Sequence, residues 1–164
     1  MNIKAISIQN PTSYLVACGA KNVENRTWKT DYRGWLYIHS SGGKDYSNIF
    51  ADDFPEAVDR IQEGSPEDLR ILARMAIFNT KLLAHYGVGF NATREECKAA
   101  EKAHGFYLRA GCIIGRVRLV DIVKDSHSPW SEAGCNHWIL EDAELFDKPI
   151  PNVVGRLRLF DVEI

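Results

Sequence analysis

Several features are missing from this sequence, and each absence excludes a class of protein. No apolar run approaches the ~20 consecutive residues that a membrane-spanning helix needs. The first residues carry neither the apolar core nor the small-residue cleavage site of a secretory signal peptide, so we expect a cytoplasmic protein. The net charge of −2 excludes a protein that holds nucleic acid by overall positive charge.

Cysteine is sparse and unpaired. The four cysteines, at positions 18, 97, 112 and 135, form no C-x-x-C pair, which favours reduced thiols used in packing. His127, Cys135 and His137 are the only cysteine-containing group that could supply three ligands to a metal. Its residues lie in a loop rich in Ser, Pro and Gly that has nothing to fix ligand geometry. We therefore expect no metal and no cofactor.

The chain has the length and composition of one globular domain, residues 1–164, with 45% hydrophobic and 26% charged residues. Its charge is uneven. Residues 1–50 carry six Lys and Arg against three Asp and Glu, a local +3, whereas residues 51–70 carry seven acids against two arginines, a local −5. This distribution places any anion site in the first third, and it makes the acidic middle a candidate surface for a protein partner.

The first forty residues predict four short elements. Residues 4–8 alternate like a strand, and residues 11–18 place apolar side chains at helical spacing before a closing glycine. Residues 23–28 and 34–39 predict two strands. Because 29–33 is a short polar turn, we expect these two strands to form a hairpin.

The middle of the chain differs in kind. Capping boxes at Ser65–Asp68 and Thr93–Glu96 each open an amphipathic helical pattern. Residues 44–108 therefore predict a helical insertion between two β-rich stretches, which is the pattern of an α+β domain with a small closed or half-closed sheet.

The last third returns to strands, at residues 115–122, 137–140 and 155–162, with a turn at 149–151. The first and last of these resemble each other in sequence, as G-R-V-R-L-V-D-I and G-R-L-R-L-F-D-V. Each predicts two arginines on one face and two apolar residues on the other. The arginines form either a phosphate-binding stripe or an ordinary solvated face.

Residues 19–28 hold the densest group of candidate functional side chains. On a strand, Glu24, Arg26 and Trp28 share one face, and Lys21 can lean over it. Such a group offers donors to a phosphate or carbonyl and an acceptor to a base edge or a proton. The alternative is a surface ion cluster whose pairs contribute under ~1 kcal/mol each.

Other residues near this motif have two interpretations each. Ser40, with the glycines and the lysine that follow it, forms either a phosphate-binding turn or a plain glycine turn. His39 is either a general acid and base or a structural hydrogen-bonding group.

The aromatic residues also have two interpretations. Trp28 and Tyr32 are candidates for stacking on a base, and Trp138 for closing the other side of the same cleft. We expect Trp35 in the core, and Arg33 either at the ligand or above an aromatic ring.

The segment Gly19-x-Lys21-x-x-Glu24-x-Arg26, with the flanking S-I-Q-N-P and Y-R-G-W-L-Y-I-H, resembles the G-x-K-x-x-E-x-R motif of the ASCH domain, a member of the PUA-like superfamily. The later N-H-W-I-L and P-I-P stretches are similar to the closing segment of bacterial and phage ASCH proteins. The resemblance covers residues 4–42 and 111–163. It implies a PUA-like small β-barrel with flanking helices and the 44–108 insertion.

The resemblance also implies a function. RNA, a nucleotide or a modified nucleobase would bind in a cleft lined by residues 19–26, with these ligand-binding residues: Lys21, Glu24, Arg26, Trp28, Tyr32, Arg33 and Ser40. The alternative is a hydrolase in the same cleft, either a ribonuclease or similar to the N4-acylcytidine amidohydrolases, with Lys21, Glu24 and His39 as catalytic residues. Those amidohydrolases have a threonine where this sequence has Glu24.

Overall fold

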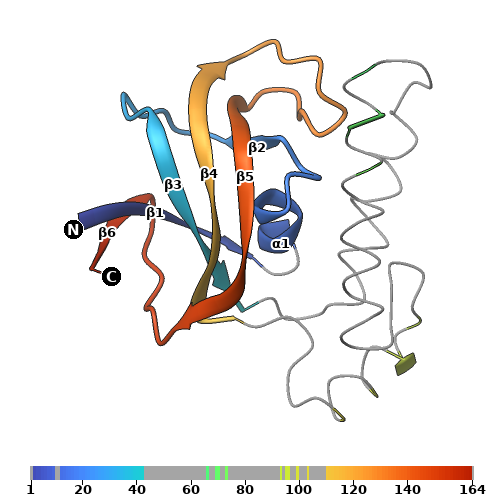
Figure 1. Ribbon diagram of the computed structural model, residues 1–164. Helices are drawn as coiled ribbons and strands as arrows, with labels where there is room; N and C mark the ends of the chain where they lie inside the picture. Colours follow the sequence, from blue (N-terminus) through green and yellow to red (C-terminus); the bar gives the residue numbers. More distant parts are fainter. Residues whose placement is uncertain are drawn as a thin grey trace.

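The computed structural model describes residues 2–9, 12–42 and 110–163, together with single residues between 66 and 103 (Figure 1). No helix in this part of the chain is long and apolar enough to cross a bilayer. The described elements are β1 (Asn2–Gln9), α1 (Thr12–Ala17), β2 (Val23–Arg26), β3 (Gly34–Ser41), β4 (Cys112–Val123), β5 (Asn136–Pro151) and β6 (Leu159–Glu163).

All the described strands join one sheet in the order β2-β5-β4-β3-β1-β6. Every neighbouring pair is antiparallel except β1 and β3. The sheet curls into a half-barrel, and α1 packs against one of its faces (Figure 1). This curled sheet with one short helix is consistent with the predicted small β-barrel, whereas the predicted flanking helices are not seen among the described residues.

The predicted insertion, residues 44–108, lies outside the described residues except for isolated positions. One local prediction within it can be checked. The Thr93 amide donates to Glu96 Oε2 at 2.7 Å, and the Glu96 amide donates to Thr93 Oγ1 at 3.3 Å. The capping box at 93–96 is therefore confirmed.

Side-chain alternation gives the sheet two buried faces. The α1 face carries Leu36 and Ile38 of β3 and Val117 and Leu119 of β4, which pack with the helix. The opposite face buries a smaller cluster: Ala5, Ile113, Phe160 and Val162. Residues adjacent along one strand therefore reach different environments, which decides where each candidate site residue points.

The predicted hairpin between residues 23–28 and 34–39 is wrong. β2 pairs with β5, in the register Val23 with Ile139 through Arg26 with Asn136, so two strands separate β2 from β3. The polar residues 29–33 carry the chain across the ends of β5 and β4 instead of folding it back. β5 is the longest strand of the sheet, and three of the four residues that it pairs with β2, Asn136, His137 and Trp138, are buried.

Two predictions in the last third also need correction. The Pro149–Pro151 segment continues β5, where Ile150 pairs with Ile113, and does not form a turn. The strand predicted over 155–162 begins only at residue 159, as β6, and Leu157 lies outside it with 95% of its surface exposed. The sequence resemblance between 115–122 and 155–162 therefore does not carry over to structure.

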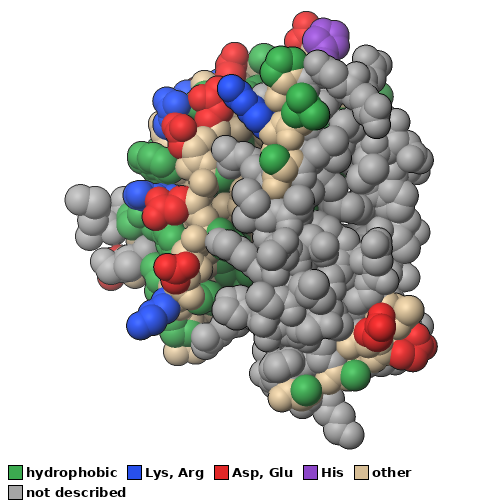
Figure 2. Space-filling model, turned by 45° about the vertical axis from the view of Figure 1, so that its right-hand side comes forward, with side chains coloured by type: hydrophobic (Ala, Val, Ile, Leu, Met, Phe, Trp, Pro, Cys, Tyr) green, Lys and Arg blue, Asp and Glu red, His purple; other side chains and the backbone are tan. Residues whose placement is uncertain are grey.

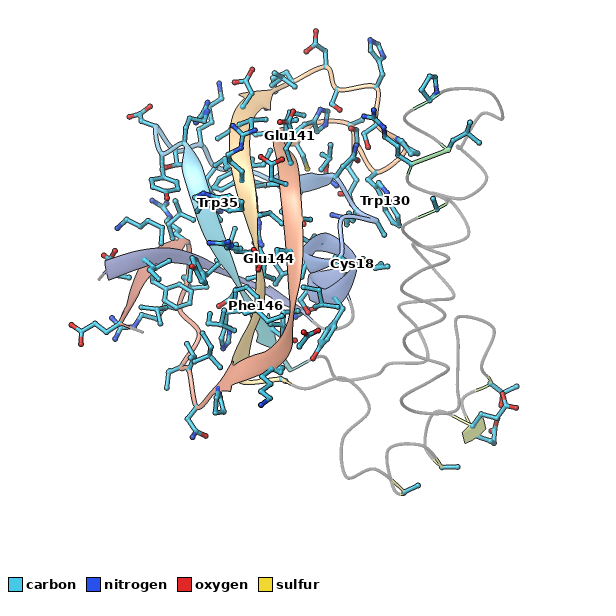
Figure 3. All side chains as sticks on the ribbon, viewed as in Figure 1. Cys18, Trp35, Trp130, Glu141, Glu144 and Phe146 are labelled. Carbon is cyan, nitrogen blue, oxygen red and sulfur yellow. The ribbon has the colours of Figure 1, made fainter. Side chains whose placement is uncertain are left out.

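Trp35 does not lie in the core as predicted. It is 38% exposed on the face opposite α1, with the Arg116 guanidinium carbon 4.4 Å from the centre of its ring. Alternation explains the difference, since the neighbour Leu36 takes the inward position on β3. Figure 3 shows Trp35 on the sheet, away from Cys18 and Trp130, which lie beside α1.

Candidate functional site

The end of α1 positions the first charged residue of the motif. Gly19 has a left-handed backbone (φ 78°), and its amide donates to the Val16 carbonyl at 3.0 Å. This is the conformation in which glycine commonly ends a helix. The turn continues until the Lys21 amide donates to the Leu15 carbonyl at 3.0 Å, so the lysine emerges beside β2 in a fixed position.

The motif's three charged side chains form one cluster, in which Lys21 and Glu24 are buried and Arg26 is partly buried. Lys21 Nζ lies 2.9 Å from Glu24 Oε2, and Arg26 Nη2 lies 2.9 Å from Glu24 Oε1. Lys21 and Glu24 are only 9% and 8% exposed. The prediction that these residues share one face is thus confirmed, and each carboxylate oxygen has its own cation. Ion pairs this far from water interact more strongly than pairs on an exposed surface.

Arg26 also joins two strands that do not pair. Its Nη2 donates to the backbone carbonyl of Ser7 on β1 at 3.1 Å, although three strands separate β1 from β2 in the sheet. The sheet therefore curls until its β2 edge approaches β1. The Nε of Arg26 is buried without a hydrogen-bond partner among the described residues.

Asn136 lies directly opposite Arg26 in the β2–β5 register. Its Nδ2 donates to the Arg26 carbonyl at 3.1 Å, which fixes the orientation of the amide and leaves Oδ1 as the free acceptor. That Oδ1 is buried and has no partner within the described part of the chain. A donor on Arg26 and an acceptor on Asn136 are thus unsatisfied on facing residues. Such buried groups are rare, because leaving one unpaired costs about 1–3 kcal/mol.

Two indole rings border the charged cluster. Trp138 pairs with Glu24 across the strands and is fully buried, so it belongs to the core beside the site. Its ring lies edge-on to Trp28, with centroids 4.6 Å apart, and its Nε1 donates to the Trp28 carbonyl at 3.3 Å. Trp28 is only partly buried. It is the aromatic residue of the predicted set that can still offer a surface to a ligand.

The loop formed by residues 126–132 is hydrogen-bonded to the motif. The sequence analysis did not predict this contact. Trp130 Nε1 donates to the Ala20 carbonyl at 2.9 Å, and Ser128 Oγ donates to Asn22 Oδ1 at 2.7 Å. Asn25 completes the attachment, since its Nδ2 donates to the Trp130 carbonyl at 2.8 Å. Figure 3 shows Trp130 on the α1 side of the sheet. The only sequence signal was a tryptophan in an otherwise polar loop.

The structure does not bring His39 to the charged cluster. Its ring faces the smaller core opposite α1, 6.1 Å from the Phe160 ring between centroids. Its Nε2 donates to the Val153 carbonyl at 2.9 Å, so Nδ1 is free to accept from the Ser7 hydroxyl at 3.1 Å. Burial lowers the pKa of His39, which favours this neutral form.

The side chains of Tyr32 and Arg33 form hydrogen bonds near their own positions in the chain, and Arg33 also pairs with a residue of β4. The Tyr32 hydroxyl donates to the Trp35 carbonyl at 2.7 Å, and burial raises its pKa. Arg33 donates to the carbonyls of Thr30 and Tyr32 and pairs with exposed Asp121 at 3.4 Å. Neither side chain makes a described contact with the cluster around Glu24.

Ser40 is fully buried and accepts a hydrogen bond from Ser13 of α1 at 3.0 Å, which ties the helix to β3. Gly43 and Lys44 of the predicted phosphate-binding turn lie outside the described residues.

Metal-ligating groups do not gather within the described ranges, where no three His, Cys, Asp or Glu side chains could hold an ion. His137 is instead occupied at both ring nitrogens. It accepts from the Ser126 amide at 3.1 Å and donates to the Glu132 carbonyl at 2.8 Å, which closes the loop before β5.

The described fold is a curled sheet with one short helix at its side and a charge cluster at the helix end. The model of the ASCH domain family matches residues 6–150. The chain therefore belongs to the ASCH domain family of the PUA-like superfamily. None of the curated proteins compared with this chain matches it.

Proposed function

We propose that this ASCH domain binds a nucleobase, carried by an RNA or a nucleotide, at the cluster formed by Lys21, Glu24, Arg26 and Asn136. The observation that carries the proposal is the unsatisfied pair, Arg26 Nε and Asn136 Oδ1, beside a buried ion cluster. A cluster that served only to close the sheet would be as well replaced by apolar packing. Buried polar atoms without partners point instead to a polar ligand.

The unsatisfied atoms suggest the type of base. Arg26 Nε donates, so it suits a ring nitrogen or carbonyl oxygen, and Asn136 Oδ1 accepts, so it suits an exocyclic amino group. Cytosine and adenine present an amino group next to an acceptor, whereas uracil has no amino group. Trp28 lies beside the cluster and is partly exposed, and stacking a base on an aromatic side chain contributes about 1–3 kcal/mol.

The same geometry supports binding over hydrolysis. Both oxygens of Glu24 already have cationic partners, so the carboxylate is less available to accept a proton from a substrate. The predicted acid, His39, faces the opposite side of the sheet. A hydrolase would need a nucleophile and a proton donor in the cluster.

A thermal-shift panel tests the proposal directly. The probes are cytidine, adenosine, uridine, their 5′-monophosphates, N4-acetylcytidine and a short single-stranded RNA. A ligand at 100 times its Kd should raise stability by about 2.7 kcal/mol. We expect cytosine or adenine compounds to stabilise the wild type more than uridine does.

Two variants locate the site. Lys21→Met keeps the apolar stem but removes the ammonium group beside Glu24, and it should abolish stabilisation by the best probe. Arg33→Met is the matched control, because it removes a cation that contacts Thr30, Tyr32 and Asp121 and makes no described contact with the Glu24 cluster. Equal loss in both variants, or in neither, would place the ligand elsewhere. Chromatography of the probe after incubation separates the two functions, since a cleaved product would establish hydrolysis.

A further inference from the structure

Residues 154–158, here called the arginine segment, form an exposed irregular stretch between β5 and β6. Its sequence is V-G-R-L-R. Val154 is 79% exposed and Leu157 is 95% exposed, and arginines stand on both sides of Leu157. These exposed side chains and the two arginines are accessible to a ligand.

The start of the segment is firmly attached. The Val153 amide donates to the Gly111 carbonyl at 3.1 Å, and the Val153 carbonyl accepts from His39. Gly155 lies so close to the sheet that a Cβ there would be 2.5 Å from His39 Cε1 and 2.6 Å from Ser7 Oγ. Ser7 is also the residue whose carbonyl accepts from Arg26. The segment thus passes close to Ser7, the residue of β1 that Arg26 of the charged cluster contacts.

The arginines of this segment differ from those of the matching stretch on β4. Arg116 pairs with Glu144 at 2.7 Å, and Arg118 pairs with Glu141 at 3.1 Å and with Asp142 at 2.5 Å. Figure 2 shows acidic and basic side chains intermixed over the described part of the face that it presents. Arg156 and Arg158, by contrast, form no ion pair with any described residue. Their positive charge is therefore available to an anion.

Arg158 connects the segment to the candidate site. Its guanidinium carbon lies 5.9 Å from the centre of the Trp28 ring. Its backbone is left-handed (φ 60°), a conformation that costs a residue other than glycine free energy. The Arg158 side chain thus lies over the partly exposed Trp28 ring at the edge of the cluster, although its backbone conformation costs free energy.

We infer that the arginine segment binds the phosphates of a single-stranded polynucleotide whose base occupies the Glu24 cluster. Arg158 lies at the rim beside Trp28, and Arg156 extends the positive charge along the chain. Two free cations at neighbouring positions suit successive phosphates, and the exposed Leu157 between them offers an apolar contact to a base or sugar. The inference rests on the proposed function, and it narrows the ligand from a free nucleoside to a strand.

Fluorescence anisotropy with a labelled short single-stranded RNA, and with DNA of the same sequence, tests the inference. The variant Arg156→Ala/Arg158→Ala is compared with Arg116→Ala/Arg118→Ala, which makes the same change in net charge. We expect the first to weaken binding of both strands about tenfold, because two solvent-exposed ion contacts are lost. It should also lower the slope of log affinity against log salt by about 1.4, at about 0.7 per phosphate contact for a single strand. The second should change neither.

Free cytidine and adenosine complete the test, because the segment should not affect their binding. If both double variants bind the strands equally, or if the salt slope is unchanged, the inference is wrong and the cluster binds without the segment. If Arg156→Ala/Arg158→Ala abolishes strand binding while Lys21→Met does not, the segment binds strands and the proposed base site fails. If the wild type binds no strand, the inference is overturned, and nucleoside binding then decides the proposed function separately.

Discussion

The guanidinium of Arg26 on β2 donates to the backbone carbonyl of Ser7 on β1 at 3.1 Å, although these strands lie on opposite sides of β5, β4 and β3. β2 and β1 are thus joined by a side chain and not by a ladder of backbone hydrogen bonds. The same guanidinium holds Glu24. Arg26 therefore both connects two strands of the curled sheet and belongs to the candidate site.

Arg26→Lys should separate these roles. Lysine keeps the positive charge but lacks the planar group that reaches Ser7 and Glu24 together. We expect a loss of about 1–2 kcal/mol of stability, close to one hydrogen bond involving a charged group. Amide hydrogen exchange should also become faster at Ser7 and its neighbours in β1. Unchanged exchange there would show that the Arg26–Ser7 contact does not hold β1 in place.

Glu24→Gln should destabilise the fold, because it leaves Lys21 and Arg26 buried without a counter-charge. Removing one partner of a buried ion pair costs about 3–5 kcal/mol, and the amide recovers part of this by hydrogen bonding. Urea unfolding measures the loss. Glu144→Gln is the control, since Glu144 pairs with Arg116 on the surface and should cost under ~1 kcal/mol. Similar losses in the two variants would mean that the Glu24 cluster behaves as a surface ion pair.

Gly155→Ala should cost about 1–3 kcal/mol, because its Cβ would collide with the His39 ring and with Ser7 Oγ. Gly42→Ala is the matched control, since a Cβ there meets nothing within 4 Å. Its effect should stay within about 0.5 kcal/mol. Thermal unfolding of both variants checks the difference. A neutral Gly155→Ala would mean that the segment does not lie against His39.

Stability should fall on mild acidification because of His39. Burial lowers its pKa in the folded protein below the ordinary histidine value of about 6.5, so the unfolded chain binds its proton more readily. Stability is then retained above pH 6.5 and is lost as the pH falls from there to the lowered pKa. His39→Gln should flatten the curve of unfolding free energy against pH in this window. Parallel curves for the variant and the wild type would exclude this role.

Local patterns predicted local structure well. The helix before Gly19 and the common face of Lys21, Glu24 and Arg26 depend only on residue spacing and on a glycine at the helix end. The capping box at 93–96 is equally local.

Predictions failed where the partner is distant in sequence. β2 pairs with a strand more than a hundred residues away, so the short turn after it suggested the wrong neighbour. Asn136 joined the site through that pairing alone, since Arg26 and Asn136 are 110 residues apart. The side chain of His39 lies on the face opposite α1, because side chains alternate along β3 and the register of β3 against β4 shifts between Ile38 and His39. Spacing within one segment carries no information on the β2–β5 pairing or on the place of Asn136 in it.

The most direct measurement is the ¹H–¹⁵N spectrum of the arginine Nε groups during titration with cytidine, adenosine and a short single-stranded RNA. The Arg26 signal is assigned by its absence in Arg26→Lys, and Arg33 serves as the internal reference. If a base fills the site, the Arg26 Nε resonance moves on binding and exchanges more slowly with water, whereas the Arg33 signal stays in place. A saturated complex in which the Arg26 signal has not moved would contradict the account.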